Sequence, residues 1–155
     1  MKGDDRLIYQ LFMAQQKLRT YITNALAAEG IKVTLGQAGI LFILRRDDGR
    51  TMTELSNALA VENPTLTGLI DRLERSSFVT RRASPDDRRS FRIHITPEGI
   101  QECDRARVVI RRINEEIKTG FSQEEIEAFK RVLNGIFQKF NQSSGASEAI
   151  RTRFL

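Results

Sequence analysis

The side chains that most often bind metals or form disulfides are nearly absent from this chain. Its 155 residues include one cysteine, Cys103, and one histidine, His94. A single cysteine cannot form an internal disulfide, and these two ligands are too few for an ordinary zinc site. The sequence also has no glycine-rich phosphate loop and no nucleophile elbow. We therefore expect no metal, no cofactor and no enzymatic activity.

Long apolar runs are missing as well. No window of the sequence is long enough to span a bilayer, and residues 1–6 lack the apolar core of a signal peptide. These absences predict a cytoplasmic protein without a membrane partner.

The overall composition is that of a folded protein with an excess of positive charge. Hydrophobic residues make up 40% and charged residues 29% of the chain, far from the composition of disordered proteins. Lys and Arg number 25 against 20 Asp and Glu, a net charge of +5 that favours anionic partners such as nucleic acid. Because many basic proteins bind no nucleic acid, the positions of the arginines have to support this interpretation.

Three helices are predicted in the first part of the chain. Residues 4–28 have apolar side chains at spacings of three and four, which indicates an amphipathic helix that Gly30 ends. Capping boxes then open two further helices, Thr34 with Gln37 and Thr51 with Glu54.

A fourth helix follows after a tight turn at residues 60–62. Asn63 is predicted to cap it and Pro64 to occupy its first position, where a missing N–H has no partner to lose. This helix, residues 64–76, has one apolar face and one polar face. Its candidate DNA-contacting residues are Asn63, Thr65, Thr67, Gly68, Arg72 and Arg75. A merely solvated polar face is the alternative.

Two short β-type runs, residues 79–83 and 90–95, flank a turn-rich segment and predict a β-hairpin with a basic loop. Arginine on a narrow loop suits the minor groove of DNA. Five arginines lie in this hairpin: Arg81, Arg82, Arg88, Arg89 and Arg92. We expect Asp87 to hold the Arg89 guanidinium through a charge-assisted pair. The candidate DNA-contacting residues of the hairpin are Asp87, Arg88, Arg89 and Arg92. A solvated hairpin with compensating charges is the alternative.

The last two helices are long and amphipathic. Thr96-Pro97 opens the first of them, and Ser122 with Glu125 opens the second, which runs to Phe140. The preceding module has only a small core and little room for their apolar faces, so we expect a partner chain to cover them. In the tail after residue 143, we expect contacts that hold Ile150, Phe154 and Leu155.

The order of these elements and several motifs resemble the MarR-like transcriptional regulators, a family named for multiple antibiotic resistance. The most specific stretches are Leu-Glu-Arg-Ser-Ser-Phe-Val-Thr-Arg at 73–81, Asp-Asp-Arg-Arg-Ser at 86–90 and Ile-Thr-Pro-Glu-Gly at 95–99. The resemblance implies a mainly α fold with a small β-hairpin wing, in which dimerisation helices flank a winged helix-turn-helix. It implies one domain, residues 1–155, with a DNA-binding region at 31–99 and dimerisation regions at 1–30 and 100–155.

By the same resemblance, the protein is a homodimeric regulator of double-stranded DNA. Its pseudo-palindromic operator would have half-sites about one helical turn apart. The resemblance further implies a repressor that a small phenolic or lipophilic effector releases. Four aromatic residues are candidates for the effector pocket, although core packing explains them equally well: Tyr9, Phe12, Tyr21 and Phe42.

Three residues differ from the pattern of the family. Ser56 stands where a small alanine is usual, and Ser77 where a glycine commonly ends the recognition helix. Gly68 stands where a basic residue is common, so that side chain is missing from the polar face.

Other interpretations remain at this point. A winged helix used as a protein-interaction module would expose apolar residues on the recognition helix, whereas this one carries Gly, Thr and Arg. Cys103 lies on an apolar helix face, which favours a buried, inert thiol over a redox sensor. His94 either touches phosphate or faces solvent, and the sequence shows no partner that would make it a pH switch.

Overall fold

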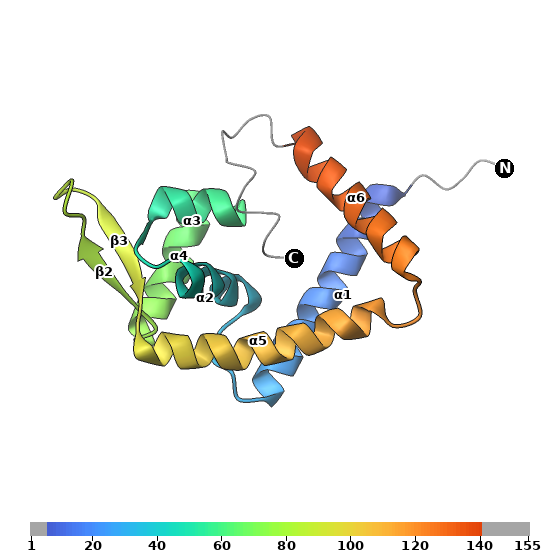
Figure 1. The fold of residues 1–155 in the computed structure, drawn as a ribbon, viewed down its shortest axis with the longest axis horizontal. Coiled ribbons are helices and arrows are strands. Elements are labelled where there is room, and N and C mark those ends of the chain that lie inside the picture. The colour runs from blue at the N-terminus through green and yellow to red at the C-terminus, as the bar shows by residue number, and fades with distance from the viewer. Residues whose placement is uncertain (1–5, 141–155) are drawn as a thin grey trace.

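The computed structural model describes residues 6–140 and has the predicted architecture, a mainly helical fold with a small sheet (Figure 1). The elements in chain order are α1 (Leu7–Ala28), α2 (Leu35–Arg46), β1 (Arg50–Thr51), α3 (Met52–Leu59), α4 (Asn63–Arg75), β2 (Val79–Ala83), β3 (Phe91–Ile95), α5 (Pro97–Lys118) and α6 (Gln123–Phe140).

Local start signals define most of these helices. The capping boxes at Thr34 and Thr51 both form, with the hydroxyl accepting from the third helical N–H and the Gln or Glu side chain accepting in return. Thr96 accepts from the Gly99 N–H at 3.0 Å and so caps α5. Ser122 accepts from the Glu125 N–H at 3.2 Å at the start of α6. The predicted starts at Thr34, Thr51, Thr96 and Ser122 are therefore confirmed.

The start of α4 differs from the prediction by one residue. Glu62 is the N-cap, no side chain caps the helix, and Asn63 is already helical. The reason is that the Glu62 carbonyl accepts from the Leu66 N–H at 3.0 Å, so the first helical hydrogen bond forms one residue early. Pro64 still lies in the first turn, where its lack of an N–H has no penalty.

The sheet has three strands rather than the two of the predicted hairpin. In the order β1-β3-β2, the short β1 pairs antiparallel with β3 through Arg50 opposite Ile93. Two residues are too few to show a strand periodicity, so the sequence could not reveal β1. β3 begins at Phe91 rather than Ser90, because Ser90 belongs to the turn and donates its N–H to the Asp87 carbonyl.

One hydrophobic core joins the C-terminal part of α1, α2, α3, α4, the sheet and one face of α5 as far as Ile113. Leu41, Leu55, Ile70 and Ile93 are fully buried within it. Gly99 is required where α5 leaves the sheet, because a Cβ there would lie 2.1 Å from the Phe78 carbonyl oxygen. The core therefore fixes the helix-turn-helix and the wing relative to each other.

Helix α6 and the N-terminal part of α1 project away from this core (Figure 1). Helix α1 packs on α5 through Ile22 and Leu26, whereas α6 has no buried residue. Within residues 6–140, no helix is both long and apolar enough to cross a membrane. The contacts expected for Ile150, Phe154 and Leu155 fall outside the described residues.

Candidate nucleic-acid interface

The turn between α3 and α4 is held by hydrogen bonds across it. Ala60 adopts the left-handed conformation with φ of 52°, and the Val61 N–H donates to the Ser56 carbonyl at 3.2 Å. The Ser56 hydroxyl donates back to the Val61 carbonyl at 2.7 Å. The Ser56 hydroxyl, which the usual alanine would lack, therefore adds a hydrogen bond that stabilises the turn leading into α4.

The predicted polar face of α4 is exposed. Asn63, Thr65, Thr67, Arg72 and Arg75 are all exposed, while Leu66, Ile70 and Leu73 point into the core. The Thr67 hydroxyl donates to the Asn63 carbonyl at 2.9 Å. Arg75 Nε donates to the Asp71 carbonyl at 3.3 Å. Among the described residues the Arg72 guanidinium has no partner, which leaves it available to an external acceptor.

Gly68 lies in the middle of this face, and the fold does not require a glycine there. A Cβ built on it would meet no atom within 4 Å. Glycine inside a helix lowers stability by about 1 kcal/mol relative to alanine. Its position is therefore open to a close approach by a partner molecule.

Arg81 has a different role from the other wing arginines. Its guanidinium lies 2.5 Å from Asp71 and also pairs with Glu74, both on α4. Its backbone N–H donates to Glu74 at 3.3 Å. Arg81 therefore fastens β2 to the recognition helix, and its charge is already compensated.

The wing loop differs from its prediction in one contact. The Asp87 carboxylate accepts from the backbone N–H of Arg89 at 2.9 Å instead of pairing with the guanidinium. An aspartate two residues before an amide commonly closes such an Asx turn, which explains the difference. Within residues 6–140, the guanidinium groups of Arg88 and Arg89 have no hydrogen-bond or ion-pair partner.

Arg92 and His94 attach β3 to the loop between α2 and β1. Arg92 donates to the Gly49 carbonyl at 3.0 Å and lies 3.9 Å from the Asp86 carboxylate. His94 Nδ1 lies 2.9 Å from the Asp48 carboxylate, which also accepts from the Ile95 N–H at 2.8 Å. His94 therefore has a carboxylate partner 46 residues away in the chain, which the sequence did not reveal. The expectation that it contacts phosphate or solvent stays a prediction.

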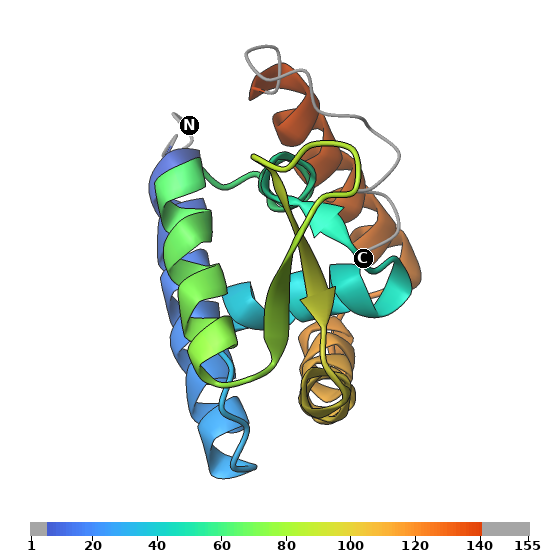
Figure 2. The same cartoon turned by 90° about the vertical axis from the view of Figure 1, so that its left-hand side faces the viewer.

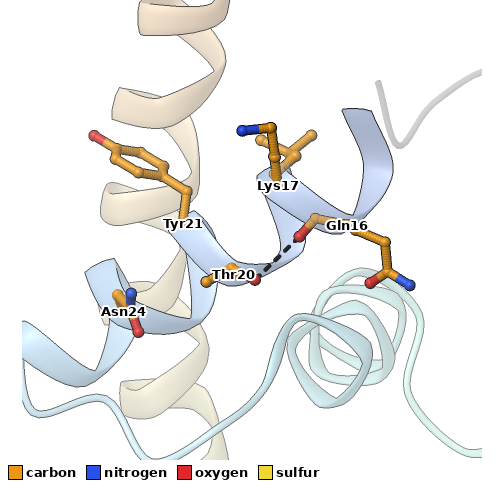
Figure 3. A pocket seen from close by; sticks show the side chains of 6 residues that line it. Gln16, Lys17, Thr20, Tyr21 and Asn24 are labelled. Atoms are coloured by element: carbon orange, nitrogen blue, oxygen red, sulfur yellow. Dashed lines mark hydrogen bonds between the residues drawn. The ribbon is translucent and has the colours of Figure 1, made fainter. Parts of the chain in front are cut away.

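The four aromatic residues proposed for an effector pocket are not all at the same hollow. Tyr21 borders a shallow hollow of about 690 Å³ along α1, together with Lys17, Thr20 and Asn24 (Figure 3). It also lines a second hollow with Ile113 of α5, whereas the other three aromatics line neither.

The remaining aromatics are exposed or belong to the core. Tyr9 and Phe12 are more than half exposed on α1. Phe42 packs against the core, and the Arg107 guanidinium carbon lies 5.6 Å from the centre of its ring. The structure therefore separates Tyr21 from the other three candidates.

One titratable group on α1 and one on α5 have shifted pKa values. The Tyr21 hydroxyl donates to both Glu116 oxygens, at 2.9 and 3.0 Å, and this bond together with the Glu116 charge raises the pKa of Tyr21. Cys103 is fully buried, and burial raises the pKa of its thiol. The prediction of a buried cysteine is confirmed.

Known proteins are similar to this chain in sequence and in fold. The model of the MarR family matches residues 33–91. The HTH-type transcriptional regulator YwoH of Bacillus subtilis (strain 168), which is uncharacterised, is 31% identical over 103 residues, or 66% of this chain and 74% of YwoH. The chain belongs to the MarR family. The family consists of DNA-binding transcriptional regulators, so this member is a DNA-binding regulator and not an enzyme.

Two solved structures extend the comparison of this MarR-family chain. The transcriptional repressor CouR, bound to a 23-mer DNA duplex, is 26% identical with a TM-score of 0.76, covering 84% of this chain and 91% of CouR. BpsR of Bordetella bronchiseptica, whose DNA binding is regulated by 6-hydroxynicotinic acid, is 20% identical with a TM-score of 0.80. That match covers 88% of this chain and 96% of BpsR, and it shows a shared fold.

Proposed function

We propose that this MarR-family regulator is a homodimeric repressor that binds a pseudo-palindromic operator through α4 and the wing of each protomer. The observation that carries the proposal is the set of guanidinium groups on these two elements that have no partner within residues 6–140, those of Arg72, Arg88 and Arg89. Arginine without an internal partner on both a helix and a neighbouring loop suits a phosphate backbone and the grooves beside it.

Helix α4 is assigned to the major groove. Its contact residues are Asn63, Thr65, Thr67, Gly68, Arg72 and Arg75. Arg72 has the free donors needed for a guanine or a phosphate, while Thr67 has committed its proton to the Asn63 carbonyl. Gly68 lets the helix backbone approach the bases closely, because no other part of residues 6–140 fills the space where its side chain would be.

The wing is assigned to the minor groove. Arg88 and Arg89 are its DNA contacts, and Asp87 shapes the loop by accepting from the Arg89 N–H. Arg92 also belongs to this set, but its guanidinium already binds the Gly49 carbonyl. We therefore assign Arg92 a smaller share of the affinity than Arg89.

The helical regions 1–30 and 100–155 are assigned to dimerisation. The apolar side chains on α1 and α6 that remain exposed in one protomer support this assignment: Leu7, Ile8, Phe12, Phe129, Val132, Phe137 and Phe140. Large exposed apolar patches on a soluble protein commonly mark protein interfaces. A second copy would cover them and place two wings on one side of the operator.

A small phenolic or lipophilic anion is the effector class that we propose. The hollow at Tyr21 combines apolar surface from Leu18 with the Lys17 ammonium, which suits a molecule with an aromatic body and a negative charge. The regulation of BpsR by 6-hydroxynicotinic acid is a precedent on the same fold. Binding in this hollow along α1 would release the operator by changing the distance between the two wings.

The test is a fluorescence anisotropy titration of duplexes carrying the upstream region of the gene or random sequence, at several salt concentrations. Arg89→Ala should weaken operator binding about tenfold and reduce the salt dependence by about one phosphate contact. Arg131→Ala removes the same charge from the exposed surface of α6 and should leave affinity unchanged. If the wild type bound neither duplex at low salt, the proposal would fail and a protein-interaction role would replace it.

A further inference from the structure

Phe91 is an exposed aromatic residue for which the interface described so far has no role. It is the first residue of β3, and 51% of its surface is exposed. In the described part of the wing, residues 79–95, the other large apolar side chains are buried or half-buried. The wing therefore presents one large apolar ring among its charged side chains, where a partner molecule could contact it.

The strand register shows which face of the wing carries Phe91. Arg81 is opposite Ile93, and Ala83 is opposite Phe91. Residues opposite each other or two apart in an antiparallel sheet share a face. Ile93 on this face is fully buried, and Arg81 reaches Asp71 on α4. Phe91 therefore lies on the face directed toward the recognition helix, roughly 7 Å closer to the wing tip than Ile93.

Strand β2 of the wing lies beside α4, where Arg81 reaches Asp71. β2 begins at Val79, soon after α4 ends at Arg75, and it runs back along the helix (Figure 2). Toward the tip the side chains between the two elements become sparse. Ala83 is exposed, and Gly68 has no atom within 4 Å of a Cβ position. The protein itself leaves the Phe91 ring uncovered here.

A DNA strand would pass through this region in the proposed complex. With α4 in the major groove and the wing in the adjacent minor groove, the sugar-phosphate backbone between the two grooves has to cross between these elements. Its deoxyribose rings are apolar, and its phosphates would meet the guanidinium groups of Arg88 and Arg89 in the wing loop, which have no partner within residues 6–140. An aromatic ring beside free arginines matches this alternation of apolar and anionic groups.

We propose that Phe91 is a further DNA-contacting residue, whose ring packs against a deoxyribose of the strand that crosses between α4 and the wing. The proposal rests on the DNA-binding mode described above. The contact contributes affinity by removing apolar surface from water and neutralises no phosphate. Its energetic signature therefore differs from that of the arginines on the same wing.

The salt dependence of binding separates these contributions. The experiment is an anisotropy titration, over several salt concentrations, of a duplex that the wild-type protein has selected from a random pool. Phe91→Ala should bind roughly tenfold more weakly at every salt concentration, with the slope of log Kd against log salt unchanged. Phe91→Leu should recover part of the loss, while Arg89→Ala should reduce the slope by about one contact.

Two results would overturn the inference while leaving the proposed function intact. Wild-type affinity in Phe91→Ala would show that the ring makes no contact. A reduced salt slope in that variant would show that the ring only supports the arginine loop. A wild-type protein that selected no duplex at all would instead refute the DNA-binding mode itself.

Photocrosslinking supplies a measurement that does not depend on the alanine variant folding. Phe91→p-benzoylphenylalanine should crosslink to the selected duplex on irradiation, because the photophore would lie against the sugar carbons. The same substitution at Val108, which is exposed on α5, is the matched control and should give no crosslink. Equal crosslinking at both positions, or none at either, would contradict the assignment.

Discussion

The winged module and the terminal helices contrast in where their apolar side chains lie. In the module, Leu55, Leu66 and Ile70 are fully buried in a core to which α2, the sheet and α5 also contribute. In α6, four large apolar residues remain exposed, up to 80% at Phe140. The apolar side chains of the module are therefore covered within one protomer, whereas those of α6 need a second surface.

This contrast assigns different energetic roles to the two regions. Burial of apolar area contributes about 25 cal/mol per Å² wherever it occurs, so exposed phenylalanines represent stabilisation that only association can supply. Contacts within the module should set its folding stability, and contacts of α1 and α6 should set the concentration at which the dimer forms.

The strongest expected effect comes from a charge on the apolar face of α6. Phe129→Asp should raise the dimer dissociation constant by roughly a thousandfold, because a two-fold interface buries two uncompensated carboxylates at about 2 kcal/mol each. Sedimentation velocity measures the change. Helical circular dichroism should persist, since Phe129 contributes nothing to the core of the module.

Asn134→Asp provides the control for this prediction. It places the same charge on the same helix, at an exposed position one turn after Lys130 and Arg131. The dimer should withstand this change. A Phe129→Asp protein that remained a dimer would show that α6 is not part of the interface.

A cavity in the module should have the next largest effect. Ile70→Ala removes a fully buried side chain between α4 and the rest of the core and should lower the free energy of unfolding by about 3 kcal/mol. Urea denaturation at constant protein concentration measures it. Leu35→Ala, at a partly exposed position on α2, should change it by less than about 1 kcal/mol. Equal losses in both variants would show that the module lacks the closed core inferred here.

The smallest expected effect concerns the hydrogen bond between Tyr21 of α1 and Glu116 of α5. The pKa of Tyr21 is raised because its hydroxyl donates to Glu116 and the negative carboxylate opposes the phenolate. The bond is therefore intact below the ordinary phenol pKa near 10 and is lost as the pH rises through the higher pKa of the folded protein.

Absorbance at 295 nm reports this titration, with Tyr9→Phe used as the background so that Tyr21 is the remaining tyrosine. In that background, Glu116→Gln should move the pKa of Tyr21 back toward 10. An unchanged titration would mean that the hydroxyl and Glu116 do not interact in solution.

Features that depend on nearby residues were predictable. Thr34 with Gln37 and Thr51 with Glu54 identify helix starts, because both partners lie within one turn of each other. The polar face of α4 followed from periodicity alone. The error at Asn63 concerns one residue and arose because the preceding turn supplied the first helical bond early. The first helix likewise begins at Leu7 rather than at residue 4, with Arg6 as its N-cap.

Features that depend on distant partners were not predictable. Asp48 meets His94 across 46 residues, and Arg50 pairs with Ile93 to form a strand too short to have a pattern. The compensation of Arg81 by Asp71 and Glu74 was hidden for the same reason, since all five wing arginines look equally free in the sequence.

The amino-acid sequence by itself determined the helices, the turn between α3 and α4, the basic wing and the family, because each of these depends on local spacing and residue type. Only the tertiary structure decided which arginine side chains stay available to bind an external partner. Arg81 and Arg92 are held by acceptors brought in from other elements, while Arg88 and Arg89 lie beyond the reach of any in residues 6–140. The physical reason is that electrostatic compensation depends on distance in space, which a linear pattern does not contain.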